Sequence, residues 1–325
     1  MVTESLGWCL ELGLNRHARF YVGRPVFYTG GLVLSLATLT VGGSLLYVDN
    51  IDDDQPEHAW AALLEISSRH NPDWAFFIPD QLRFFVSKVK EEMRFGPFPK
   101  QILTMGAPIS GEEKVAVSQA FNCNVIESWG NSESLGTITD AEDLSTRPDS
   151  IGRPFLTDEL FIVDETGNRL GPNQIGRIAG HREAGFTKYA RQDEATKATI
   201  VGDMIISDDI GKTDEGGRFY VLGREADLIS VSGRPVTVAM IERTVRLKYP
   251  QLRFVIILLT RDQRQPQLGI LTEGATKSTV VEVASLISQE HGFEFRFRHL
   301  NVDSLPKLPT GKPDRMRIAD ILGRA

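Results

Sequence analysis

Short apolar runs alternate with helical patterns through residues 1–136, and this alternation constrains the fold more than any other feature of the chain. The apolar runs have the length of buried strands and occupy residues 45–48, 74–78, 101–105 and 124–128. The helical patterns occupy residues 6–14, 32–41, 59–68, 81–92 and 112–121. Strands that are apolar throughout and separated by helices are typical of a parallel sheet covered on both faces. This part of the chain is therefore predicted to be α/β.

The segment from residue 30 to residue 48 has no charged side chain, so it has to be considered as a membrane span. Pairs of glycines interrupt it at positions 30–31 and 42–43, and hydroxyl side chains lower its hydrophobicity. We interpret it as a buried helix, a Gly-Gly turn and a buried strand, and we expect no membrane span.

Two further regions follow the α/β part. Residues 151–222 combine short strands with turns, which predicts a small antiparallel barrel or sandwich. Residues 225–325 alternate helices and strands again and are predicted to form a compact α+β module. We therefore expect a large domain over residues 1–224, with an α/β part at 1–140 and a β-rich part at 141–224, and a compact C-terminal domain over 225–325.

Composition and charge exclude several classes of protein. The formal net charge is −7, which argues against a general nucleic-acid binder, because such proteins need a basic surface. The two cysteines are too few for a disulfide scaffold, and they fit a reducing cytoplasm. The first residues, Met1-Val2-Thr3-Glu4, do not read as a signal peptide. The six histidines form no HxxH or HxxxH pair, so a structural metal site is not expected.

Lys312 is the first candidate for chemistry, because it lies in a loop punctuated by Pro309, Gly311 and Pro313. Proline restricts its own backbone and the residue before it, and glycine accepts conformations that other residues avoid. Such a loop can present one cation at a defined place, although the same composition is also typical of an ordinary surface loop.

Further motifs occur upstream in a defined order. They are Gly106-Ala107-Pro108, Trp129-Gly130-Asn131-Ser132-Glu133, Ser150-Ile151-Gly152-Arg153-Pro154, Ser207-Asp208-Asp209-Ile210-Gly211 and Gly223-Arg224. With the lysine loop, this series resembles the adenylate-forming superfamily, which includes acyl-CoA synthetases, peptide-synthetase adenylation domains and luciferases. The resemblance runs across nearly the whole chain.

The resemblance implies activation of a carboxylic acid with ATP to an acyl-adenylate, followed by transfer to a thiol of CoA or of a carrier-protein phosphopantetheine. Two anions must meet in the first step, so cations and oriented dipoles are needed where charge develops. Lys312 matches the catalytic lysine of the family. Glu133 matches the acid that helps hold magnesium, a cation that prefers oxygen ligands.

The resemblance also assigns nucleotide contacts. Gly106-Ala107-Pro108 matches the adenine-binding turn. Ser132 takes the usual Thr position and can donate to a phosphate oxygen, while Trp129, beside Gly130, replaces the commoner Tyr and can stack on adenine or belong to the core. Asp209 matches the acid that accepts hydrogen bonds from the ribose hydroxyls, and Arg224 matches the second ribose contact. Asp208-Asp209 would also be compatible with a solvated turn.

Other positions depart from the family pattern. Ala226 stands at the position of the hinge on which the C-terminal lid domain of the family swings, where relatives usually have Asp or Lys. Asp227, next to it, is a candidate to compensate for the missing charge. Tyr28 stands where many relatives have His near the acyl pocket, although core packing would also explain it. Pro235 and Met240 replace residues usual in CoA ligases, which weakens the case for efficient use of CoA.

The Ser/Thr/Gly-rich phosphate loop of relatives, Thr-Ser-Gly-Thr-Thr-Gly-x-Pro-Lys-Gly, has no equivalent in the sequence. Residues 1–4 resemble those that follow it, so the large domain is expected to be incomplete. Three explanations stay open: a longer or split enzyme, a catalytically weak or inactive remnant that binds AMP or an acyl-adenylate, and a natural short form that acts with a partner chain. Because part of the sheet is expected to be missing, Val33, Leu36, Leu39 and residues 45–48 are expected to be exposed or covered by a homodimer or second polypeptide.

Overall fold

The computed structural model describes most of the chain, namely residues 2–48, 56–91, 98–133, 135–156, 158–181, 186–231, 234–260, 266–308 and 313–324. The chain divides into two compact units. The first comprises Met1–Ser207 and Lys212–Val221, and the second comprises Asp208–Gly211 and Leu222–Ala325. The domain boundary expected from the sequence, between residues 224 and 225, stays a prediction.

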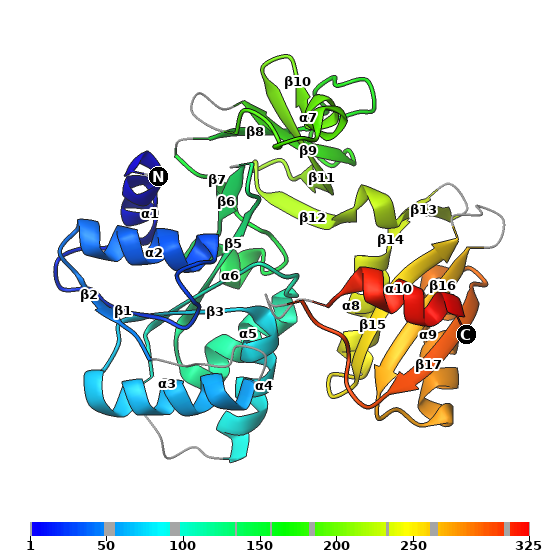
Figure 1. Ribbon diagram of the computed structural model, residues 1–325, viewed down its shortest axis with the longest axis horizontal. Coiled ribbons are helices and arrows are strands. Elements are labelled where there is room, and N and C mark those ends of the chain that lie inside the picture. The colour runs from blue at the N-terminus through cyan, green and yellow to red at the C-terminus, as the bar shows by residue number, and fades with distance from the viewer. Residues whose placement is uncertain are drawn as a thin grey trace. The chain divides into compact units, whose positions relative to one another are not determined.

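The first unit is built on a sheet whose strand order, over the described residues, is β2-β1-β3-β4-β5-β6-β7 (Figure 1). These strands are β1 (Arg19–Val22), β2 (Ser44–Leu46), β3 (Trp74–Phe77), β4 (Gln101–Met105), β5 (Asn124–Gly130), β6 (Gly136–Ile138) and β7 (Arg153–Pro154). The strands from β2 to β5 run parallel, and β6 and β7 extend the sheet with antiparallel pairings. The predicted α/β class with a parallel sheet is confirmed.

Helices cover both faces of this sheet (Figure 1). One face carries α1 (Val2–Leu12) and α2 (Thr29–Thr40), and the other carries α3 (Pro56–His70), α4 (Pro79–Glu91) and α5 (Gly111–Phe121). Successive side chains of a strand point to opposite faces. Phe20 and Val22 therefore join the core under α1 and α2, while Tyr21 joins the core under α3, α4 and α5.

The uncharged segment that begins at Gly30 forms most of α2 and the edge strand β2. Within the described residues, no helix is long and apolar enough to cross a bilayer. Leu39 is 56% exposed, as expected, but the expectation for Val33 is wrong, because this side chain is only 4% exposed. It packs in one cluster with Trp8 and Leu12 of α1, which cover this part of α2.

The predicted β-rich region is confirmed as a five-stranded sheet in the order β10-β11-β9-β8, with β12 paired to β11. Its elements are β8 (Glu159–Val163), β9 (Gly176–His181), β10 (Ile200–Val201), β11 (Met204–Thr213) and β12 (Phe219–Arg224), with the helices α6 (Ala141–Thr146) and α7 (Asp193–Thr199). Buried Ile162, Ile178 and Phe219 form its core. Gly152 has φ +85°, and a Cβ atom there would lie 1.9 Å from the Ile138 carbonyl oxygen, so only glycine fits.

The second unit contains the sheet β15-β16-β17 and a β13-β14 hairpin. Its elements are η1 (Glu225–Asp227), β13 (Leu228–Val231), β14 (Arg234–Thr237), α8 (Val238–Lys248), β15 (Arg253–Thr260), β16 (Gln267–Glu273), α9 (Lys277–His291), β17 (Arg296–Val302) and α10 (Arg315–Arg324). Helices α8 and α9 pack on one face of the larger sheet and α10 packs on the other (Figure 1). The compact α+β character predicted for this region is confirmed.

Candidate functional site

The candidate site in the first unit lies at the carboxyl edge of the parallel strands. Strands β4 and β5 are paired in register, with Met105 opposite Ser128. The Gly106-Ala107-Pro108 turn follows β4, and Trp129 and Gly130 end β5, so these two predicted motifs are neighbours. Ligands of open α/β sheets bind beyond the carboxyl ends of the strands, and both motifs lie there.

The turn after β4 depends on a glycine. Gly106 has φ +94°, a backbone conformation that side chains with a Cβ rarely adopt. The chain then enters α5 through a capping box: the Ser110 hydroxyl accepts from the Glu113 amide at 3.2 Å, and the Glu113 carboxylate accepts from the Ser110 amide at 2.7 Å. The turn therefore begins at a glycine with positive φ and ends at the capped start of α5.

The loop from β5 to β6 presents the predicted phosphate and magnesium residues. The Asn131 amide donates to the Leu135 carbonyl at 3.1 Å, and the Asn131 side chain accepts from the Leu135 amide at 2.9 Å, which closes the loop. Ser132 is exposed and Glu133 is half-buried. The Tyr189 hydroxyl donates to Glu133 Oε1. Sequence reasoning missed Tyr189, since nothing in its neighbourhood indicated this contact.

Trp129 is half-buried against the core of the β-rich region, which also contains Leu135 and Ile151. A Cβ atom on Gly130 would lie 3.2 Å from the Leu135 carbonyl oxygen, so the hairpin is tight at this point. The indole of Trp129 therefore contributes to packing and leaves part of its surface accessible.

Tyr28 lies at the start of α2, in the loop that follows β1. The Arg24 guanidinium carbon lies 5.0 Å from the centroid of the Tyr28 ring, and Arg24 is only 5% exposed. A Cβ atom on Gly30 would lie 3.2 Å from the Met105 sulfur at the end of β4. The start of α2 therefore meets the same edge of the sheet as the Gly106 turn.

A buried ion pair lies beneath this edge. Lys114 Nζ on α5 donates to Glu127 Oε2 on β5 at 2.6 Å and to the Ser150 carbonyl at 2.9 Å. The two side chains are 3% and 8% exposed. Burial raises the pKa of Glu127, and the nearby ammonium of Lys114 opposes that shift. The pair joins α5, β5 and the Ser150 motif, and sequence analysis did not identify it.

In the second unit, the two predicted ribose contacts lie side by side. Arg224 Nε and Asp209 Oδ1 are 2.9 Å apart. The Asp209 side chain is 11% exposed and that of Arg224 is 60% exposed, so the guanidinium is accessible while the carboxylate is held in place. The predicted hinge residue Ala226 lies in the exposed 3-10 turn η1 that follows directly.

Lys312 lies outside the described residues. The segments on either side of its loop are paired, since Lys307 and Pro313 form an antiparallel bridge. The Asp314 amide also donates to the Pro306 carbonyl at 3.0 Å.

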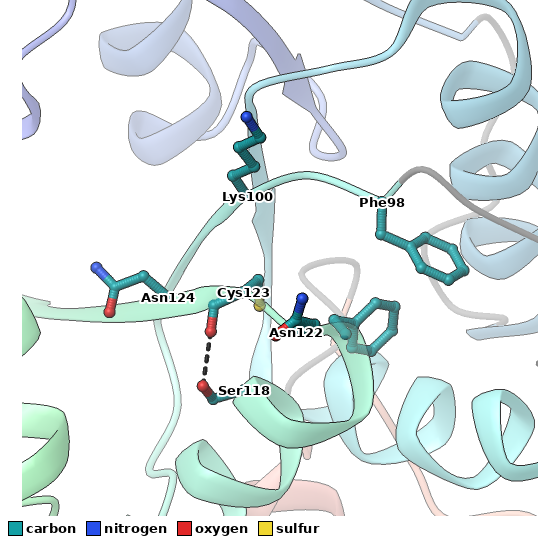
Figure 2. A pocket seen from close by; sticks show the side chains of 7 residues that line it. Phe98, Lys100, Ser118, Asn122, Cys123 and Asn124 are labelled. Carbon is teal, nitrogen blue, oxygen red and sulfur yellow. Dashed lines mark hydrogen bonds between the residues drawn. The ribbon is translucent and has the colours of Figure 1, made fainter.

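An open pocket lies near the opposite, amino edge of β4 and β5 (Figure 2). It is lined by Phe98, Lys100, Ser118, Phe121, Asn122, Cys123 and Asn124. The Ser118 hydroxyl donates to the Cys123 carbonyl at 2.6 Å. Burial raises the pKa of Cys123 to about 12, so its thiol is not a nucleophile at neutral pH. None of the predicted site residues lines this pocket.

The comparisons with known proteins point to one family. The family model for AMP-binding enzymes matches residues 1–189. A luciferin 4-monooxygenase from Photuris pensylvanica is 29% identical over 301 residues, which are 90% of this chain and 53% of that protein. The mitochondrial acyl-coenzyme A synthetase ACSM4 from Homo sapiens is 26% identical over 256 residues, which are 74% of this chain and 44% of that protein. The chain thus spans about half the length of these relatives.

A solved structure of a CoA ligase has a similar fold. The anthranilate CoA ligase AuaEII, in complex with anthranoyl-AMP, superposes with a TM-score of 0.80 at 20% identity. The superposition covers 98% of this chain and 62% of the ligase.

Proposed function

Because the chain belongs to the AMP-binding enzyme family, we propose that it activates a carboxylic acid to an acyl-adenylate and passes the acyl group to a thiol. The observation that supports this most directly is the family match over residues 1–189, which includes both the Gly106-Ala107-Pro108 turn and the Trp129–Glu133 loop. These two motifs are neighbours at the carboxyl edge of the sheet.

In the first unit, the proposal assigns the Gly106-Ala107-Pro108 turn to adenine and Trp129 to stacking on its ring. Gly130 allows close approach, and Ser132 is assigned to the α-phosphate. The half-buried carboxylate of Glu133 offers an oxygen ligand suited to magnesium, which would neutralise phosphate charge when bound. The Tyr189 hydroxyl orients this carboxylate by donating to one of its oxygens.

In the second unit, the accessible face of the Asp209–Arg224 pair is proposed to bind the ribose hydroxyls. Lys312 is proposed as the cation that stabilises the charge developing between carboxylate and α-phosphate. Ala226 is proposed as the hinge of the C-terminal lid, and Tyr28 as a wall of the acyl pocket. CoA and a carrier-protein phosphopantetheine are the two proposed acceptors.

Calorimetry tests the nucleotide part of this proposal. The assigned residues cover adenine, ribose and the α-phosphate, so we expect a non-hydrolysable acyl-AMP to bind more tightly than ATP with magnesium. Clearly tighter binding of ATP would contradict the assignment.

Pyrophosphate release with a panel of carboxylic acids tests the reaction itself. Release that depends on one class of acid would support the ligase. Binding of acyl-AMP without release would favour the alternative, a chain that binds AMP or an acyl-adenylate without turnover or acts only with a partner chain. Absence of both binding and release would overturn the proposal.

A further inference from the structure

Arg83, on α4, donates four hydrogen bonds: one to the turn after β4, two to Glu113 on α5 and one within α4. Its Nε donates to Glu113 Oε1 at 2.6 Å and its Nη2 donates to Glu113 Oε2 at 3.1 Å. Its Nη1 donates to Asp80 Oδ1 at 2.6 Å, and its Nη2 also donates to the Pro108 carbonyl at 2.7 Å. The side chain is 22% exposed, so these contacts are partly shielded from water.

The bond to Pro108 matters because the turn has few constraints of its own. Gly106 is in a backbone region that favours glycine, which is also the most flexible residue, and Pro108 has no amide hydrogen to donate. The carbonyl of Pro108 accepts from Arg83, a side chain on another helix, so α4 holds the turn from outside.

Glu113 links the same arginine to the start of α5. One of its oxygens accepts from both Arg83 and the Ser110 amide, so the helix cap and the turn share one carboxylate. The guanidinium donates four hydrogen bonds in a fixed fork, two of them to Glu113, whereas an ammonium has only three donor hydrogens and no planar fork. A lysine therefore keeps the positive charge but cannot reproduce this set of contacts.

We propose that Arg83 is a positioning residue, which holds the Gly106-Ala107-Pro108 turn in the conformation that binds adenine. The adenine assignment rests on the proposed function, but the hydrogen bonds of Arg83 to Pro108 and Glu113 do not depend on it. Arg83 touches no reacting group in this proposal and acts only through Pro108 and Glu113.

Arg83→Lys tests the proposal, because it keeps the charge next to Glu113 and Asp80 and removes the planar fork. Arg19→Lys is the matched control. Arg19 also pairs with one carboxylate through two nitrogens, at 3.2 Å each to Asp73, and donates to a backbone carbonyl, that of His70, at 3.4 Å. It does so at the start of β1, away from the Gly106 turn.

Two measurements are made on the full chain. Calorimetry compares AMP, adenosine and ribose 5-phosphate as ligands. We expect Arg83→Lys to weaken AMP and adenosine about fivefold to tenfold and to leave ribose 5-phosphate unchanged, and Arg19→Lys to change none of them. Hydrogen exchange of the unliganded protein follows the amides of residues 106, 107, 109 and 110, which should exchange faster in Arg83→Lys than in the wild type or the control.

Unchanged affinity for adenosine together with unchanged exchange at residues 106, 107, 109 and 110 would overturn the proposal. So would an equal loss in Arg19→Lys, because that would indicate a general effect on the sheet. If the wild type binds neither AMP nor adenosine, the adenine assignment of the proposed function fails, and the exchange experiment alone decides whether Arg83 holds the turn.

Discussion

Lys114→Met should strongly destabilise the first unit, because it leaves the Glu127 carboxylate buried without its cation. The ammonium lies 2.6 Å from Glu127 Oε2, and the two side chains are only 3% and 8% exposed. Removing one partner of a buried ion pair typically costs about 3–5 kcal/mol. Methionine retains most of the aliphatic length of lysine, so lost packing contributes little to this change.

Urea denaturation followed by tryptophan fluorescence measures this loss in the relevant unit. The four tryptophans are Trp8, Trp60, Trp74 and Trp129, and all belong to the first unit. Lys197→Met is the control for the same chemical change, because Lys197 pairs with Glu194 at side-chain exposures of 72% and 90%. An exposed pair of this kind contributes at most about 1 kcal/mol.

The loss should also depend on pH. Burial already raises the pKa of Glu127, and removing Lys114 removes the charge that opposes this shift. A carboxyl group whose pKa is higher in the folded state favours folding below its unfolded pKa, and this contribution is lost as the pH rises. The destabilisation by Lys114→Met should therefore be largest near pH 7.5 and should shrink as the pH is lowered toward 5.

The double variant Lys114→Met/Glu127→Gln separates charge from packing, since it removes the buried carboxylate as well. We expect it to be more stable than Lys114→Met at pH 7.5. A loss below about 1 kcal/mol in Lys114→Met, equal at both pH values, would refute the reasoning, because it would mean that Glu127 is solvated or paired elsewhere.

Three further predictions concern single residues. Gly152→Ala should cost about 1–3 kcal/mol more than Gly202→Ala in urea denaturation, because both have positive φ but only Gly152 has a backbone oxygen within 1.9 Å of the new Cβ; equal losses would contradict this. Burial raises the pKa of Cys9, and that of Cys123 to about 12, so neither thiol should react with Ellman's reagent at pH 8 before unfolding; a fast-reacting thiol in the native protein would show that this burial is wrong. Lys312→Ala should lower acid-dependent pyrophosphate release about 10²–10³-fold and leave AMP affinity nearly unchanged; an equal loss of affinity would make Lys312 a binding residue only.

Hydrophobic runs predicted the central strands well. Strands β3, β4 and β5 fall within about two residues of the expected ranges, because fully buried parallel strands are apolar along their whole length. Strand β1 was missed. Its four residues, Arg19–Val22, become a strand because they pair with β2 on one side and β3 on the other, and no local pattern specifies those neighbours.

The second unit also contains a strand that was not predicted. Strand β17, Arg296–Val302, alternates basic and apolar residues at its start, a period-two signal that sequence analysis could have used. It pairs in parallel with β16, and α9 is the crossover helix that a parallel pair of strands needs. The order of strand, helix and strand along the chain is therefore a second signal that could have predicted this pairing.

The sequence by itself determined the candidate ligand contacts through motifs in a defined order, and Asp209 and Arg224 do lie 2.9 Å apart. Which charged side chains pair with one another around these motifs was decided only by the tertiary structure. Arg83 and Glu113 are 30 positions apart, and Lys114 and Glu127 are 13 apart, on elements that become neighbours only when the sheet is assembled. The physical reason is that helix and strand patterns reflect short-range burial, whereas the energy of an ion pair depends on which charges are desolvated together in the folded chain.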